Sequence, residues 1–267
     1  MPAPNAITPK QLLRLIGTSR APVLVDICTD TDFEQDPYLI PGSVRHPAKD
    51  LDGVKGLIAN RPCIIICQKG KKLSQAVVSW LRSEGVAAEY LEGGMYAWRE
   101  TPDAPRIPFA DIPASPSLWV TRHRPKIDRI ACPWLIRRFI DPNARFLFVA
   151  PSEVAKVSEV FNATPFDVEG VRWSHRGDNC TFDALVKDFQ LATPAMNRLA
   201  TVVRAADTNR HDLAPEAAGL LAVSVGLSRQ YKDDHQAIEA GMHLYDALYL
   251  WARDGFDEKH DWPAVEK

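Results

Sequence analysis

The sequence predicts an α/β domain with a parallel sheet flanked by helices, followed by a mainly helical α+β domain. Short β-branched runs alternate with helical periodicity in the first part, whereas helical patterns dominate the second. Between the two parts, five prolines stand within 15 residues, which is too many for a helix interior or a central strand. We therefore predict domains at 1–103 and 117–267, joined by a semi-rigid, proline-rich linker at 104–116.

The first domain contains the elements of a parallel sheet. Residues 22–27 and 63–67 are apolar, β-branched runs of the kind that form strands covered on both faces. The apolar spacing of residues 73–84 predicts a helix that ends at Gly85, and a third strand is expected at 88–91. Because a strand, a helix and a strand in this order form a right-handed crossover, we expect the strands to run parallel.

The second domain has few strand candidates and many helical segments. Residues 118–121 and 145–149 are short strand candidates. A helix is expected at 128–140, and further helical patterns cover roughly 151–162, 181–190, 194–210, 215–229 and 235–253. Pro194 and Pro215 stand where a first helical turn begins, which is a position that proline tolerates.

Composition and charge exclude several classes of function. The formal net charge is −2 and neither half is strongly basic, so no general field attracts nucleic acid or an anionic membrane. No apolar segment has the length of a transmembrane helix, and the N-terminus lacks the apolar core of a signal peptide. The five cysteines are an odd number, which favours reduced thiols over a disulfide framework. We expect a cytoplasmic protein with no nucleic-acid or membrane partner.

The strongest local signal is the loop Cys67-Gln68-Lys69-Gly70-Lys71-Lys72, between a predicted strand and a predicted helix. A loop that enters a helix N-terminus presents successive backbone N–H groups to one point, where they stabilise negative charge together with the helix dipole. The three lysines add to this field, and Gly70 allows a tight turn. Such surroundings favour the thiolate, which is the nucleophilic form of cysteine. The alternative is a buried structural cysteine before a solvated lysine loop.

Four motifs stand in order in the first domain. They are Leu24-Val25-Asp26-Ile27, Ile40-Pro41-Gly42-Ser43, the loop from Cys67 to Lys72, and Leu91-Glu92-Gly93-Gly94-Met95-Tyr96-Ala97-Trp98. Together they resemble the motifs of the rhodanese family. The resemblance implies that Cys67 accepts a sulfane sulfur as a persulfide from a donor such as thiosulfate. It implies transfer to cyanide or a thiol, anion binding by residues 68–72, and no required cofactor. The six-residue loop resembles that of the sulfur-handling members, because the related phosphatases have a loop one residue longer.

Two departures from the family pattern stand near this loop. The arginine that often follows the strand aspartate by two positions is here Cys28, and the usual serine after the loop is here Leu73, with Ser74 one place on. We interpret Asp26 as a supporting residue and expect the loss of the arginine to loosen the structure beneath the loop. Lys72 stands where many members have arginine and offers positive charge without a bidentate fork. Cys28 is either a small buried residue or a second thiol near the site.

Polar residues gather in three segments of the second domain, within 122–129, 173–182 and 207–216. Asp207 and His211 share a face if the helix persists that far. With His175 and Glu216 they form a candidate site for a metal ion of unknown identity, because imidazole and carboxylate groups are common metal ligands. The alternative is structural, with Asp212 capping the next helix and His175 hydrogen-bonded.

The same segments carry a second resemblance. Residues 119–122, 128–141, 175–182 and 207–220 resemble the C-terminal domain of the chromate-resistance protein B family. That family is linked to chromate sensing and resistance, and its best-described members have a DNA-binding N-terminal part. Because a rhodanese-like domain stands in that position here, a transcriptional role is not expected. We hypothesise a sulfurtransferase linked to resistance against chromate or a related oxyanion.

Two other functions stay open. The first is a non-catalytic protein that senses or binds an oxyanion or a metal in chromate resistance. The second is a thiol-dependent oxyanion reductase that uses Cys67 together with Cys28 or Cys63.

Overall fold

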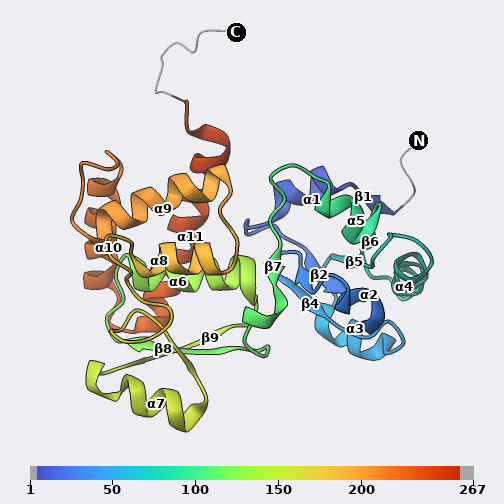
Figure 1. Ribbon diagram of the computed structural model, residues 1–267, viewed down its shortest axis with the longest axis horizontal. Coiled ribbons are helices and arrows are strands. Elements are labelled where there is room, and N and C mark those ends of the chain that lie inside the picture. The colour runs from blue at the N-terminus through green and yellow to red at the C-terminus, as the bar shows by residue number, and fades with distance from the viewer. Residues whose placement is uncertain (1–4, 259–267) are drawn as a thin grey trace.

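A computed structural model describes residues 5–258 and has two parts that lie side by side, each with its own sheet (Figure 1). The predicted fold class is confirmed, because a parallel sheet flanked by helices is followed by a mainly helical part. Residues 1–4 and 259–267, which the predicted domains include, lie outside the described residues. The proposed boundaries at 103 and 117 stay predictions.

The N-terminal part contains a five-stranded sheet with the strand order β1-β6-β5-β2-β4, and all of its pairings are parallel. Its strands are β1 (Ala6–Ile7), β2 (Val23–Asp26), β4 (Ser43–Arg45), β5 (Cys63–Ile66) and β6 (Ala88–Leu91). Its helices are α1 (Pro9–Leu15), α2 (Asp30–Glu34), α3 (Leu51–Ile58), α4 (Lys72–Ser83) and α5 (Gly94–Arg99). The strands predicted at 22–27, 63–67 and 88–91 and the helix predicted at 73–84 are confirmed within two residues at each end.

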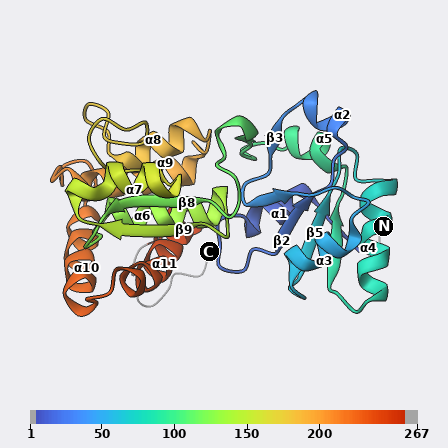
Figure 2. The ribbon, with the colours of Figure 1, turned by 90° about the horizontal axis from the view of Figure 1, so that it is seen from below.

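Both faces of this sheet are covered, which explains why its inner strands β2 and β5 are largely apolar (Figure 2). Leu24 and Ile64 belong to the core that also includes side chains of α1, α2 and α5. Their neighbours Val25 and Ile65 point to the opposite face and pack with α3 and α4.

The proline-rich segment is packed against the N-terminal part. Residues Ile107–Pro108 form strand β7, which pairs antiparallel with β3 (Tyr38–Leu39), and a 3-10 helix follows at Phe109–Asp111. Ile107 is fully buried, and the indole of Trp98 donates to the carbonyl of Pro105 over 3.0 Å. The predicted linker therefore includes a short strand that the proline pattern alone did not predict.

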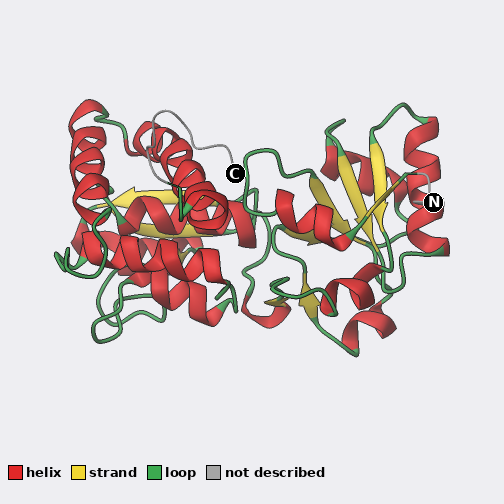
Figure 3. Cartoon of the chain, turned by 90° about the horizontal axis from the view of Figure 1, so that it is seen from above, coloured by secondary structure: helices red, strands yellow, loops and turns green. Residues whose placement is uncertain are grey.

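The C-terminal part has a three-stranded parallel sheet under a layer of helices, as Figure 3 shows. Its strands are β8 (Leu118–Arg122), β9 (Arg145–Val149) and β10 (Thr164–Pro165). Its helices are α6 (Asp128–Leu135), α7 (Val154–Phe161), α8 (Thr181–Asp188), α9 (Pro194–Asp207), α10 (Ala217–Gln230) and α11 (Asp234–Leu250). Helix α6 continues as a π-helical turn at Ile136–Ile140, and α11 continues as another at Trp251–Gly255.

The two parts share one hydrophobic core, which contains side chains from both. The backbone N–H of Gly42 donates to the carbonyl of Phe139 over 2.6 Å. The ring of Phe139 lies against Gly17, where a Cβ would overlap it. These contacts hold the two parts in one arrangement. Within residues 5–258, no helix combines the length and the apolar character that crossing a membrane requires.

Candidate functional site

Cys67 ends the apolar run of β5 and is the first residue of the loop that leads into α4. Its side chain is only 5% exposed. The sulfur lies 3.2 Å from the hydroxyl oxygen of Ser74, which is fully buried in the first turn of α4. The same hydroxyl lies 3.2 Å from the carbonyl oxygen of Lys71. Ser74, one place later than the family pattern has its serine, therefore contacts the sulfur directly.

The amides of the loop are available to an anion. Within the described chain, the backbone N–H groups of residues 68–72 donate to no backbone or side-chain acceptor. They precede or open the 12-residue helix α4, whose dipole adds positive potential at this end. Lys69, Lys71 and Lys72 are exposed, so their ammonium groups surround the loop in solvent.

Two glycines allow the loop to pack tightly against the start of α5. The N–H groups of Met95 and Tyr96 donate to the carbonyl oxygens of Cys67 and Gln68, over 3.1 and 3.2 Å. A Cβ on Gly94 would overlap the Cys67 carbonyl, and one on Gly70 would overlap the Leu91 carbonyl. Both have positive φ angles, of 60° and 61°. Gly94 and Gly70 thus allow the close approach in which the Met95 and Tyr96 N–H groups bond the loop carbonyls.

The expected loosening beneath the loop stays a prediction, and an arginine from another strand, Arg45 of β4, lies beside Cys28. Arg45 is the register partner of Asp26 across β2 and β4. Its guanidinium donates to the Cys28 carbonyl over 3.1 Å and to Asp30 over 2.8 Å, and lies over the Phe33 ring. A guanidinium group from the neighbouring strand β4 therefore contacts the backbone at Cys28, the position where the family pattern often has arginine.

Asp26 and Cys28 are both buried below the loop. Asp26 accepts from the backbone N–H of Cys28 over 2.8 Å, and burial raises the pKa of its carboxyl. Burial also strongly raises the pKa of the Cys28 thiol, and the nearby Asp26 and Cys67 raise it further. Cys63 lies at the other end of β5, about 13 Å away along the strand, and burial raises its pKa to about 11. Burial therefore disfavours the thiolate form of both Cys28 and Cys63, the two thiols that the reductase alternative pairs with Cys67.

A second polar centre lies in the C-terminal part. The imidazole Nε2 of His175 lies 3.2 Å from a carboxylate oxygen of Asp207, 3.5 Å from Asp167 and 3.7 Å from Asp128. The ligand atoms of Asp128, His175 and Asp207 all lie within 4.8 Å of one another. A single Nε2–H can point at only one acceptor, so His175 cannot donate to all three carboxylates at once.

Asp128 is the most deeply buried member, with 1% of its surface exposed. Its two oxygens accept from the backbone N–H groups of Thr181 and Phe182, over 2.7 and 3.0 Å, at the N-terminus of α8. Burial nevertheless raises the pKa of its carboxyl well above the ordinary value, and Asp207 and Asp167 raise it further. Ile127, just before it, has a φ of 36°, a strained angle for a β-branched residue. The chain tolerates burial and strain to hold this carboxylate in place.

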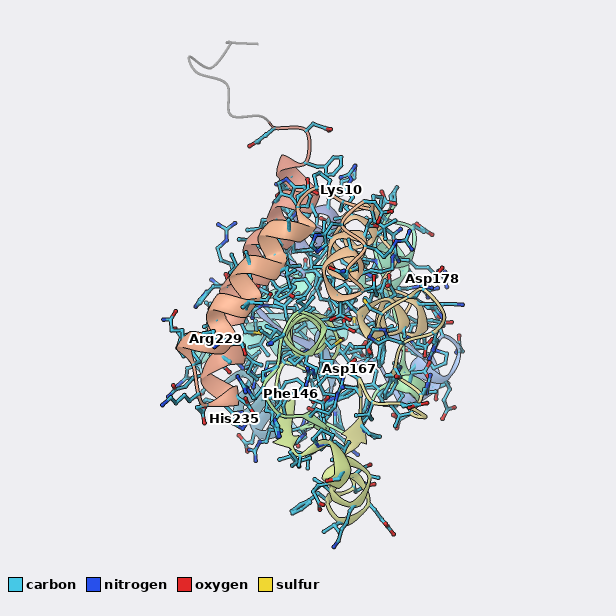
Figure 4. The ribbon with its side chains drawn as sticks, turned by 90° about the vertical axis from the view of Figure 1, so that its left-hand side faces the viewer. Lys10, Phe146, Asp167, Asp178, Arg229 and His235 are labelled. Carbon is cyan, nitrogen blue, oxygen red and sulfur yellow. The ribbon has the colours of Figure 1, made fainter. Side chains whose placement is uncertain are left out.

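Asp167 joins the cluster to two arginines. Its carboxylate pairs with Arg122 over 2.9 Å and with Arg129 over 3.2 Å, and it accepts from the hydroxyl of Thr181 over 3.0 Å. Asp167, labelled in Figure 4, is buried, with 4% of its surface exposed. Three carboxylates thus face two guanidinium groups, and His175 stands at the exposed side with 42% of its side chain in solvent.

The fold brings together only two of the four predicted metal ligands, which were His175, Asp207, His211 and Glu216. His175 and Asp207 meet, but within the described residues the cluster with metal-ligand spacing includes Asp128 and not His211 or Glu216. The helical spacing fails because α9 ends at Asp207, and Asn209 turns the chain with a φ of 57°. The sequence analysis did not identify Asp167 as a member of this cluster, because Asp167 lies outside the three polar segments at 122–129, 173–182 and 207–216.

The loop that carries His175 is held by its neighbours. Arg176 forms a bidentate pair with Asp188 of α8, with both N···O distances 2.8 Å, and Arg172 lies 3.6 Å from the same carboxylate. This pairing lowers the pKa of Asp188. Cys180 and Cys132 are fully buried nearby, and burial strongly raises the pKa of both thiols.

Comparisons with known proteins match both parts of the chain. The family model of the rhodanese-like domain matches residues 8–101, and that of the ChrB C-terminal domain matches residues 119–252. Protein ChrB of Cupriavidus metallidurans is 34% identical over 132 residues, which are 49% of this chain and 39% of that protein. The chain therefore spans about two fifths of the length of this curated relative.

Two solved structures resemble the N-terminal part. A rhodanese-like domain protein from Staphylococcus aureus is 30% identical, has a TM-score of 0.31, and covers 35% of this chain and 90% of its own. A rhodanese-related protein from Thermoplasma volcanium is 23% identical, has a TM-score of 0.33, and covers 39% of this chain and 97% of its own.

Proposed function

The chain belongs to the family defined by the ChrB C-terminal domain and carries a rhodanese-like domain before it, and from this premise we propose that it is a sulfurtransferase with Cys67 as the sulfur carrier. The observation that carries the proposal is the loop of five unpaired amides between Cys67 and the first turn of α4. Such a loop stabilises an anionic sulfur, and it stabilises an anionic persulfide in the same way.

The proposed reaction has two displacements. The Cys67 thiolate attacks the outer sulfur of thiosulfate, the sulfur–sulfur bond breaks, and sulfite leaves with the bonding electrons. The resulting Cys67 persulfide is then attacked at its outer sulfur by cyanide or a thiolate, which gives thiocyanate or a new persulfide and regenerates the Cys67 thiolate. Residues 68–72 hold the negative charge through both steps, and the exposed Lys69, Lys71 and Lys72 attract the anionic donor.

The test is intact mass after thiosulfate treatment, together with thiocyanate production from cyanide. We expect the wild type to gain one sulfur atom and the Cys67→Ala variant to gain none and to form no thiocyanate. Cys63→Ala is the matched control, because this thiol lies on the same strand at the opposite end. Equal activity of the wild type and Cys67→Ala would contradict the proposal.

The C-terminal domain connects this chemistry to chromate resistance in our proposal. Its support is the match to the ChrB C-terminal domain, which covers half of the chain. The partners are then a small sulfur donor, a thiol or cyanide acceptor, and an oxyanion such as chromate. All five cysteines are free and buried, which suits a reducing compartment such as the cytoplasm.

A second candidate function is metal binding by Asp128, His175 and Asp207. One imidazole nitrogen and two carboxylates suit Mn²⁺, Fe²⁺ or Zn²⁺, and the surplus of carboxylates over guanidinium groups favours an added cation. When bound, such an ion supplies Lewis acidity, while Arg122 and Arg129 orient Asp167 beside it.

Metal analysis and melting curves with Mn²⁺ and Zn²⁺ test this candidate. We expect a metal-dependent rise in melting temperature that Asp207→Asn removes and Asp212→Asn keeps, since Asp212 is exposed and pairs with Arg210. Equal metal-induced shifts in both variants would contradict a site at Asp207.

A further inference from the structure

A cavity of about 560 Å³ lies where the two parts of the chain meet. One wall is formed by residues 16–24 with Gly42 and Arg61, and the other by residues 137–145 with α11. Its size falls in the usual range of small-molecule sites, which often occur between domains. Because the Gly17–Phe139 and Gly42–Phe139 contacts fix the two walls, the cavity is preformed.

Positive charge dominates the lining. Arg61, Arg137, Arg138 and Arg145 line the cavity, together with His243 and a single carboxylate, Glu239. Glu239 pairs with Arg137, and Asp246 forms a bidentate pair with Arg138, with both distances 2.8 Å.

Two of the four arginines that line the cavity form no ion pair with a carboxylate in the described part of the chain. Within residues 5–258, neither Arg61 nor Arg145 has a carboxylate within 4.0 Å. One of these exposed arginines comes from each part of the chain, and both line the cavity; the Arg61 Nε also donates to the Ile58 carbonyl over 3.4 Å.

We propose that this cavity binds a small molecule through a doubly charged anionic group of the phosphate class. The two unpaired guanidinium groups match such a dianion in charge, and guanidinium favours the planar, forked hydrogen bonding that phosphate oxygens accept. The paired Arg137 and Arg138 are held in fixed positions and complete the wall.

This site is separate from the two centres described above. It lies at the amino ends of β2 and β5, whereas Cys67 lies at the carboxyl end of β5, and neither Asp128 nor His175 lines it. A bound anion contacts both parts of the chain, so its binding stabilises their arrangement.

Calorimetric titration of the full chain with inorganic phosphate and pyrophosphate, at low and constant ionic strength, tests the proposal. We expect saturable binding to the wild type and an affinity at least about tenfold weaker in the Arg61→Gln/Arg145→Gln double variant. Arg229→Gln is the control, because this exposed arginine lies on α10 away from the cavity (Figure 4). Melting temperatures of the variants without anion report whether they fold.

The loop after Cys67 is also able to hold an anion, so the assignment depends on the double variant. If neither anion binds the wild type, or if binding to the double variant is unchanged, the proposal is overturned. Sodium chloride at matched ionic strength separates specific binding from screening, which weakens interactions at all exposed charges alike.

Discussion

The Cys67 sulfur lies 3.2 Å from the hydroxyl oxygen of Ser74, which is buried in the first turn of α4. A hydroxyl has one proton, and the Ser74 hydroxyl also has the Lys71 carbonyl as an acceptor at 3.2 Å. When the sulfur is a thiol, it can donate to the hydroxyl oxygen while the hydroxyl donates to Lys71. When the sulfur is anionic, the hydroxyl turns to donate to the sulfur instead. Ser74 therefore serves both forms of Cys67.

Replacing Ser74 with alanine should slow sulfur transfer about tenfold, since a hydrogen bond to a charged group contributes about 1.5 kcal/mol or more. The rate of Cys67 alkylation should fall in parallel. Ser79→Ala is the control, because Ser79 is exposed on the same helix. Thiocyanate production and iodoacetamide labelling measure both effects, and unchanged rates in Ser74→Ala would show that the contact is only structural.

Replacing Gly94 with alanine should destabilise the protein by about 3 kcal/mol or more, because a Cβ there overlaps the Cys67 carbonyl in addition to the unfavourable φ. Gly85→Ala separates the two causes. Gly85 has a φ of 82° but open space around it, so only the backbone strain of about 1 kcal/mol applies. Urea unfolding compares the two variants, and equal losses of stability would rule out the overlap as a cause.

The N-terminal fold and loop were predictable because their signals are local. Cys67 to Lys72 and Gly93-Gly94 are short motifs, and the strand before the first of them, Cys63–Ile66, is an uninterrupted apolar run. The contact between Arg45 and the Cys28 carbonyl could not be predicted from the sequence. Arg45 lies 17 positions from Cys28 and reaches it only because β2 and β4 pair in this register. A residue-by-residue comparison with the family pattern cannot detect such a contact.

The C-terminal centre was predictable only in part because its members come from distant segments. Asp128 opens α6, His175 lies in a loop and Asp207 ends α9, and no sequence period relates them. His211 was chosen on helical spacing from Asp207, and that spacing fails where Asn209 adopts a positive φ. A buried aspartate with backbone donors, such as Asp128, has no signature in the sequence alone.

Replacing Arg45 with glutamine should lower the free energy of unfolding by about 1–2 kcal/mol, because the bonds to Cys28 and Asp30 and the stacking on Phe33 are lost. The nearby buried Asp26 would also lose the positive charge that opposes its raised pKa. The stability of Arg45→Lys should lie between those of the wild type and Arg45→Gln, since lysine keeps the positive charge without the forked hydrogen bonding of guanidinium. Lys49→Gln is an exposed control. If Arg45→Gln were as stable as the wild type in urea unfolding, the contacts of Arg45 would not stabilise the fold.

Asp188 should make stability depend on pH in the acid range. Its pairing with Arg176 lowers the pKa of the Asp188 carboxyl in the folded state below its ordinary value, so the carboxylate stabilises the fold at pH values above that ordinary pKa. This contribution is lost as pH falls through the lowered folded pKa. At neutral pH we expect Asp188→Asn to lose about 0.5–1 kcal/mol, because Arg176 is 40% exposed and solvent screens the pair.

The difference between Asp188→Asn and the wild type should shrink in urea unfolding from neutral pH down to about pH 3. Asp178→Asn is the control, since Asp178 is exposed in the same loop (Figure 4). A difference that stays constant over this range would mean that packing of Asp188, rather than its charge, holds the loop. Because Arg176 is next to His175, loss of the pair should also weaken any metal-induced stabilisation at the Asp128–His175–Asp207 cluster, whereas Asp178→Asn should leave it unchanged.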